Sequence, residues 1–121
     1  MRKQYYFRDS PDGLLAWDVD RLVELSRAFP RKMVPLSALR ELHEPLVNDG
    51  EAPGVVDEHL RLIDEADLSY AIILSASGAV MDGRHRLAKA AREGRHQIEA
   101  VQFDEDPTPD FVGRGPDDLP Y

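Results

Sequence analysis

The stretch that decides the fold covers residues 70–103 and reads YAIILSASGAVMDGRHRLAKAAREGRHQIEAVQF. Residues 71–74 form a short apolar run, which predicts a buried strand because such strands are covered on both faces. A turn with the sequence Ser-Ala-Ser-Gly follows, and residues 79–81 predict the returning arm of a hairpin. A helix is expected from about 84 to 93, and a last strand at 98–103.

Outward from this stretch, apolar spacing and Pro or Gly breaks predict the flanking elements. We expect helices over 18–29 and 55–66, a strand over 32–36, and a surface excursion over 39–54. In the helix over 55–66, Val56, Leu60 and Ile63 are expected to point inward. Helices combined with a small mixed sheet predict the α+β class.

The chain length of 121 residues matches one domain. We expect a single domain over 1–103 with an N-terminal helical extension, followed by an acidic, proline-rich tail over 104–121. The tail either wraps the surface or is mobile. The sequence has no cysteine, and no apolar run approaches the roughly 20 residues that span a bilayer. These features exclude thiol chemistry and predict no membrane partner and a cytoplasmic location.

Charge is distributed unevenly along the chain. The net charge of -8 argues against extensive nucleic-acid binding, yet residues 82–96 carry a net charge of +3. Gly83, Arg84, His85 and Arg86 fall at a helix start, where free N–H groups and the helix dipole attract anions. Lys89 lies one turn further and could reach a distal phosphate. These residues predict a phosphate site.

A structural interpretation of the same residues stays open. Asp82 could cap the helix, hold Arg86 or bind Mg²⁺ through its oxygens, and the cap is favoured. Gly83 could serve only as a turn, and the basic residues could form a solvated face. His59 is read as a half-buried histidine, and Trp17 as a core residue rather than a base-stacking one.

The order of hairpin, Gly83-Arg84-His85-Arg86 turn, helix and strand resembles the N-terminal domain of ParB-like partition proteins and the sulfiredoxins. The resemblance is strongest over 70–103. It implies that the turn holds the phosphates of a nucleotide, such as ATP or ADP, usually with Mg²⁺. Arg84 stands where sulfiredoxins have their catalytic cysteine, so their repair chemistry is not implied. Partition proteins have Glu-Arg-Arg after the glycine.

The free-serine kinases of the same superfamily resemble the chain at Asp82-Gly83-Arg84-His85-Arg86 and require a catalytic acid after the first strand. Glu41 and Glu44 are the corresponding candidates, and Asp82 is the third catalytic candidate. The resemblance therefore implies binding of a nucleotide or another phosphorylated small molecule, with hydrolysis or transfer of its phosphate left open. The alternatives are a non-catalytic regulatory domain with a protein partner or a second copy of the chain, and a DNA-associated, nuclease-like role.

Overall fold

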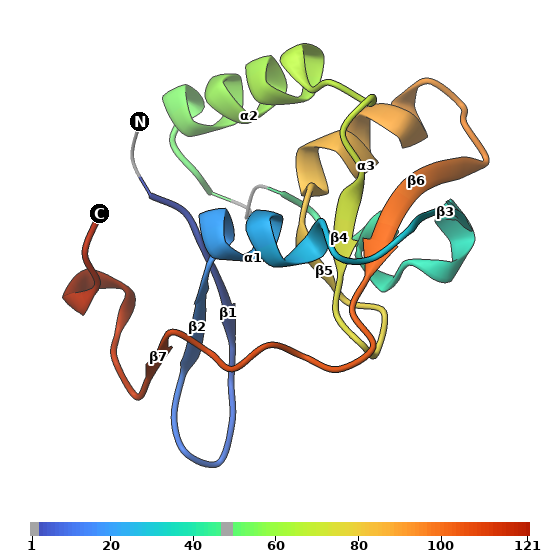
Figure 1. The fold of residues 1–121 in the computed structure, drawn as a ribbon. Coiled ribbons are helices and arrows are strands. Elements are labelled where there is room, and N and C mark those ends of the chain that lie inside the picture. Colours follow the sequence, from blue (N-terminus) through green and yellow to red (C-terminus); the bar gives the residue numbers. More distant parts are fainter. Residues whose placement is uncertain (1–2, 47–49) are drawn as a thin grey trace.

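The computed structural model describes residues 3–46 and 50–121 and has the α+β architecture expected from the sequence. Figure 1 shows the arrangement of the elements. The strands are β1 (Tyr5–Arg8), β2 (Leu15–Asp18), β3 (Arg31–Pro35), β4 (Ile72–Leu74), β5 (Val80–Asp82), β6 (Gln97–Gln102) and β7 (Phe111–Val112). The α-helices are α1 (Val19–Ser26), α2 (Pro53–Glu65) and α3 (Arg84–Arg92), and short 3₁₀ helices are η1 (Leu36–Ala38), η2 (Arg40–His43) and η3 (Pro116–Asp118).

The larger sheet has the strand order β3-β6-β4-β5, with β4 parallel to β6 and the other pairs antiparallel. The hairpin of β4 with β5 and the strand β3, which lies at an edge of the sheet, agree with the elements predicted from the sequence. Ile72, Ile73 and Leu74 are all buried, because β4 lies inside the sheet and both of its faces are covered.

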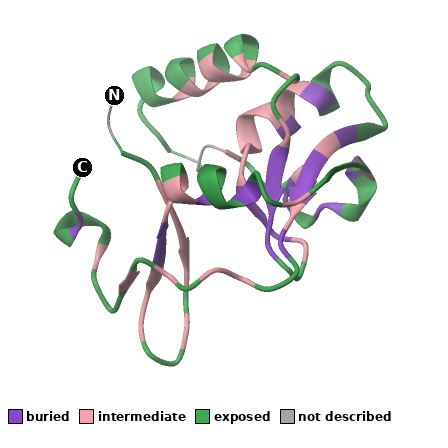
Figure 2. Cartoon of the chain, in the orientation of Figure 1, coloured by how far each residue is buried: buried purple, intermediate pink, exposed green. Residues whose placement is uncertain are grey.

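The side chains of β4 alternate between two core clusters. Ile72 and Leu74 pack with Leu87 and Ala90 of α3, on one face of the sheet. Ile73 packs on the opposite face with Trp17 and Leu22, from β2 and α1. Figure 2 shows this buried centre in the strands of the larger sheet. Trp17 is therefore a core residue, as predicted.

The N-terminal region contains more strand than the sequence analysis expects. Besides the predicted helix α1, which Asp18 caps by accepting from Asp20 N, residues 5–18 form the hairpin of β1 with β2. The aromatic residues 5–7 and the turn signal at 10–13 are typical of such a hairpin. The strand β7 joins it to make a second sheet, so the fold has two sheets instead of the single one expected.

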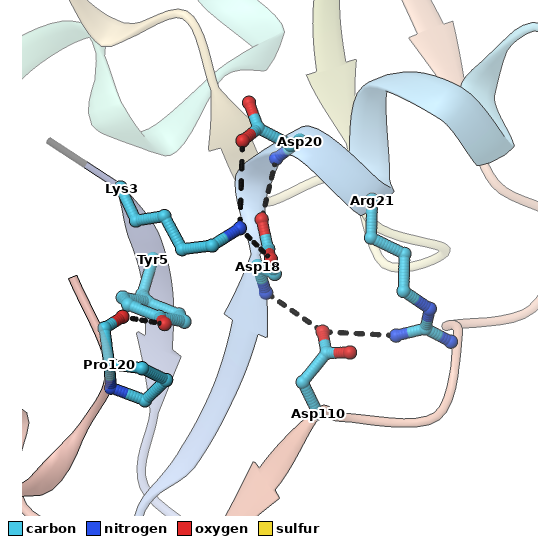
Figure 3. Close-up of polar contacts among 7 residues, drawn as sticks. All are labelled: Lys3, Tyr5, Asp18, Asp20, Arg21, Asp110 and Pro120. Carbon is cyan, nitrogen blue, oxygen red and sulfur yellow. Dashed lines mark hydrogen bonds and ion pairs between the residues drawn. The ribbon is translucent and has the colours of Figure 1, made fainter. Parts of the chain in front are cut away.

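The tail over 104–121 wraps the surface, which was one of the two interpretations left open. Trp17 Nε1 donates to Pro107 O at 2.7 Å. Figure 3 shows Asp110 Oδ2 accepting from Asp18 N at 2.8 Å and from Arg21 at 3.1 Å, while Tyr5 donates to Pro120 O. These contacts and the pairing of β7 with β2 make the tail part of the folded unit.

The helix α2 agrees with its prediction except at Leu60. It packs beside α3 but contains no buried residue in the structure, and Leu60, expected to point inward, is 50% exposed. Val56 and Ile63, which were expected to point inward, are half-buried, as are His59, which was also expected to be, and Leu62. The prediction for Leu60 is wrong because α2 contacts its neighbour along a narrow stripe that includes His59 rather than Leu60.

Two further expectations concern the segment before α2 and the membrane. Of the surface excursion expected over 39–54, residues 47–49 lie outside the described residues, and η2 precedes them. Within residues 3–46 and 50–121, no helix has the length and apolar character that a membrane span requires.

Candidate functional site

The start of α3 has the geometry of a strand-to-helix turn. Asp82 ends β5, opposite Ile73 of β4, and Gly83 occupies the N-cap position with a φ of 107°. No side chain among the described residues caps the helix, and the hydrogen bond from Leu87 N to Gly83 O is the first of the helix. The prediction that Asp82 caps the helix is therefore wrong. The backbone N–H groups of the first turn are left without a capping side chain.

Gly83 is required here for two reasons. Its positive φ is a conformation that residues with a Cβ rarely adopt. A Cβ added at this position would also lie 2.5 Å from Ile72 Cγ2 and 2.9 Å from Arg86 Nη2. The first turn of α3 thus sits directly against the buried strand β4, which fixes its position in the fold. The close approach of a phosphate to this glycine stays a prediction.

A cleft of about 710 Å³ opens beside this turn. It lies between β1 on one side and η2, β5 and the start of α3 on the other. Six of the eight residues predicted to form the site line it: Glu41, Glu44, Asp82, Gly83, Arg84 and His85. The structure therefore brings together residues that are about 40 positions apart in the sequence.

Glu41 is the most deeply placed acid in the cleft, with 8% of its surface exposed. Its Oε2 accepts a hydrogen bond from Val80 N at 2.8 Å, which gives this backbone N–H of the edge strand β5 a partner. Its Oε1 is buried and has no hydrogen-bond partner among the described residues. A buried carboxylate oxygen without a partner carries a desolvation cost, so it favours a cation or a hydroxyl donor.

Arg84 lies at the mouth of the cleft, where it approaches the segment that follows η2. Its Nη2 donates to the carbonyls of Glu44 at 3.2 Å and Pro45 at 3.4 Å, and lies 3.8 Å from the Glu44 carboxylate. The side chain is partly exposed, and a guanidinium has five N–H donors. Arg84 is thus able to bind a further anion while keeping these contacts.

His85 pairs with His59 across the gap between α3 and α2. Nε2 of His85 lies 2.9 Å from Nδ1 of His59, and the rings stack with their centroids 5.1 Å apart. Burial, together with the neighbouring His59 and Arg84, lowers the pKa of His85 below its ordinary value. The neutral imidazole is therefore favoured. In that form one ring nitrogen donates a hydrogen bond and the other accepts one.

The two remaining predicted residues point away from the cleft. Arg86 lines two smaller pockets and forms an ion pair with Asp82 at 3.0 Å. Of the three roles considered for Asp82, the structure therefore has the one in which it holds Arg86. Lys89 donates to the carbonyls of Asp64 at 2.9 Å and Ala66 at 2.8 Å, at the end of α2. Lys89 binds a helix terminus in this structure, and a role toward a phosphate stays a prediction.

The positive charge of residues 82–96 is partly compensated by acids from elsewhere in the chain. Glu44 lies beside Arg84, and Asp64 of α2 pairs with Arg92 at 2.7 Å. The local field is therefore weaker than the sequence count of +3 suggests.

Several cleft residues were not predicted as site residues. Arg40, His59, Tyr5 and Tyr121 also line it. The aromatic cluster at residues 5–7 was a sequence signal for Tyr5, which packs edge-on against Tyr121 at 5.4 Å between ring centroids. Tyr121 and Arg40 carried no such signal, because only the docking of the tail and of η2 brings them to the cleft.

The described residues contain no cluster of three or more His, Cys, Asp or Glu side chains that could hold a metal ion without other ligands. Mg²⁺ in phosphate sites is usually held by one or two carboxylates together with phosphate oxygens and water. Glu41, with its free Oε1, and Asp82 supply oxygen ligands of this type.

Comparisons of the chain with protein-family models, with curated proteins and with solved structures gave no match.

Proposed function

We propose that the cleft beside α3 binds a nucleotide or another phosphorylated small molecule, with a phosphate at the turn from Gly83 to Arg86. The observation that carries this proposal is the meeting of an uncapped helix start with Arg84 and the half-free carboxylate of Glu41 in one cleft. The N–H groups and Arg84 attract a phosphate, and Glu41 accepts from a hydroxyl or binds a cation.

The order of elements supports the same proposal. The hairpin of β4 and β5, the Gly83 turn, α3 and then β6 follow one another as in the ParB-like and sulfiredoxin-like domains that the sequence resembles. We propose a distant relationship to that superfamily on this basis. The lack of cysteine separates the chain from sulfiredoxin chemistry.

Acidic side chains in the cleft bear on how the ligand binds. Glu41, Glu44 and Asp82 would repel a phosphate in the absence of a cation. Mg²⁺ would neutralise part of this charge, and we therefore expect nucleotide affinity to rise when Mg²⁺ is added. Glu41 is the residue that we propose for transfer or hydrolysis, because it lines the cleft and its buried Oε1 has no hydrogen-bond partner among the described residues.

The test is a calorimetric titration of ATP, ADP, GTP and CTP, with and without Mg²⁺, into the wild type and Arg84→Gln. Arg84→Gln removes one charge-assisted contact and is expected to weaken binding about tenfold. Arg95→Gln is the matched control, since Arg95 belongs to the same basic stretch but does not line the cleft. Absence of binding by all four nucleotides, or equal binding by Arg84→Gln, contradicts the proposal.

A second variant separates binding from turnover. Glu41→Gln keeps an oxygen that can accept from Val80 N but removes the charge. We expect it to bind nucleotide and to release or transfer no phosphate in an assay with small hydroxyl acceptors. If the wild type binds nucleotide without any turnover, the site is a sensor rather than a catalytic centre.

A further inference from the structure

A second pocket, the α1 pocket, lies between α1, the residues that lead into β4, and the side chain of Arg86. It has a volume of about 390 Å³, which falls within the range of small-molecule sites. Asp82 is the one described residue that lines both this pocket and the cleft. The α1 pocket is therefore a separate site, although it is adjacent to the proposed phosphate turn.

The floor of the α1 pocket is apolar. Ile73 and Val101, from the central strands β4 and β6, are buried beneath it, and Phe29 forms part of its wall. Phe29 is held in place by an edge-on contact with Phe103, with ring centroids 5.5 Å apart. Tyr70 stands at the rim with its ring largely exposed. An aromatic or branched apolar group would gain contact area against this floor.

Three arginines, Arg27, Arg31 and Arg86, are among the residues that line the same pocket, and Asp82 is the one acid among its described lining residues. The chain as a whole is strongly acidic, so this concentration of arginine is unlike its average surface. Arginine forms bidentate hydrogen bonds with carboxylates, which makes it the preferred cation for such groups.

The present partners of these arginines leave donors free. Arg27 pairs with Glu24 at 2.9 Å, but both side chains are about 70% exposed, and such surface pairs are weak. Arg31 donates to Ser69 O at 2.9 Å and lies 3.4 Å from Glu99. Each guanidinium has five N–H donors, so neither contact uses more than part of its capacity.

Arg86 adds an independent observation. Its ion pair with Asp82 is mostly buried, and its Nε is buried without a hydrogen-bond partner among the described residues. A buried donor without a partner costs free energy, and an acceptor brought by a ligand would remove this cost.

We propose that the α1 pocket binds a small organic carboxylate that carries an aromatic or branched apolar group. The carboxylate contacts the arginines, and the apolar group lies over Ile73 and Val101 beside Phe29. This site differs in chemistry from the cleft, because it offers side-chain guanidinium groups over an apolar floor instead of backbone N–H groups at a helix start.

The test uses phenylacetate as the probe and 2-phenylethanol as its neutral counterpart, in a titration followed by ¹H–¹⁵N correlation spectra of the full chain. Phenylacetate at millimolar concentration is expected to shift the amides of Arg27, Phe29 and Ala71, and the alcohol to bind at least about tenfold more weakly. Shifts that are absent, that fall elsewhere, or that are equal for the two compounds overturn the proposal.

Two variants localise the effect. Arg31→Gln changes a half-exposed rim residue and is expected to reduce phenylacetate affinity about tenfold. Ala71→Leu places a larger side chain in the pocket and is expected to abolish binding. Arg61→Gln is the control, because Arg61 pairs with Glu65 on α2, away from the pocket. If Arg31→Gln, with an unchanged spectrum in the absence of probe, binds like the wild type, the proposal is wrong.

Discussion

The helices α3 and α2 lie side by side at the cleft but are held by different forces. The first is anchored in the core by Leu87 and Ala90, both buried, and by the contact of Gly83 with Ile72. The second buries no residue fully. Its contacts with α3 include half-buried apolar side chains and the polar contacts of Lys89 with its C-terminal carbonyls and of His59 with His85. We therefore expect α3 to open only with the core and α2 to open more easily.

The largest expected effect comes from Gly83→Ala. The added Cβ combines a positive φ with an overlap against Ile72, so we expect a loss of about 4 kcal/mol in the free energy of unfolding. Gly94→Ala is the control, because Gly94 also has a positive φ but nothing within 4 Å of its Cβ position. We expect that control to cost about 1 kcal/mol in denaturant unfolding. Equal losses would show that Gly83 is not packed as described.

A matched pair of leucines tests the same contrast between the helices. Leu87→Ala in α3 removes a buried side chain and is expected to cost about 3 kcal/mol, since it leaves a cavity beside Ile72. Leu60→Ala in α2 changes an exposed side chain and should cost less than about 0.5 kcal/mol. Chemical denaturation measures both. A large loss for Leu60→Ala would place α2 deeper in the fold than the structure has it.

Lys89→Met tests the polar attachment of α2. The change removes two hydrogen bonds to the end of that helix, so local opening of α2 should become easier by about 1 kcal/mol. Amide hydrogen exchange measures this opening residue by residue, and the amides of α3 should be unaffected. Lys32→Met is the control, because Lys32 contacts Gln102 in the larger sheet. Unchanged exchange in α2 would contradict this attachment.

The smallest effect is a pH dependence. The pKa of His85 is lowered in the folded protein, mainly by burial and then by His59 and Arg84, with Asp82 opposing them and Arg86 adding to them. The unfolded chain therefore binds the proton more tightly, and the free energy of unfolding falls as the pH drops through the ordinary value of 6.5. Protection factors of the α2 amides, which correct for the slower intrinsic exchange at acid pH, should then fall.

His85→Asn is the control for this pH dependence. The substitution removes the titrating ring, so part of the change in stability between pH 7 and pH 5 should disappear. Stability curves measured by denaturant at a series of pH values give the answer. An identical pH dependence in the wild type and in His85→Asn would show that His85 contributes nothing to it.

The elements predicted best from the sequence are those whose local patterns lie close together in the chain. In residues 70–103, apolar runs, a turn and a terminal glycine lie close together, and the structure has the expected hairpin, helix and strand there. The β1–β2 hairpin was missed, although its aromatic residues favour strands, because each strand has only four residues and β2 also pairs with β7 of the distant tail. The prediction that Leu60 points inward was wrong. The apolar periodicity of a helix predicts which side chains share a face, but not which other element that face packs against.

Most residues of the candidate site could be named from the sequence, but the contacts among them could not. Glu41 and Glu44 were named from the order of elements, and the structure places them in the cleft with Arg84 and His85. The sequence could not show that Asp82 pairs with Arg86 instead of capping the helix, since both roles use the same spacing. Nor could it show the pairing of His59 with His85, which depends on how α2 packs against α3.

The most direct measurement is a titration of the ¹⁵N-labelled chain with ATP and Mg²⁺, following the backbone amides of Arg84, His85 and Arg86. These N–H groups form the first turn of α3, so binding of a phosphate there must change their resonances directly. We predict saturable shifts at these three amides, weakened in Arg84→Gln and unchanged in Arg95→Gln. Unmoved amides at this turn, whether or not other residues respond, would contradict the account.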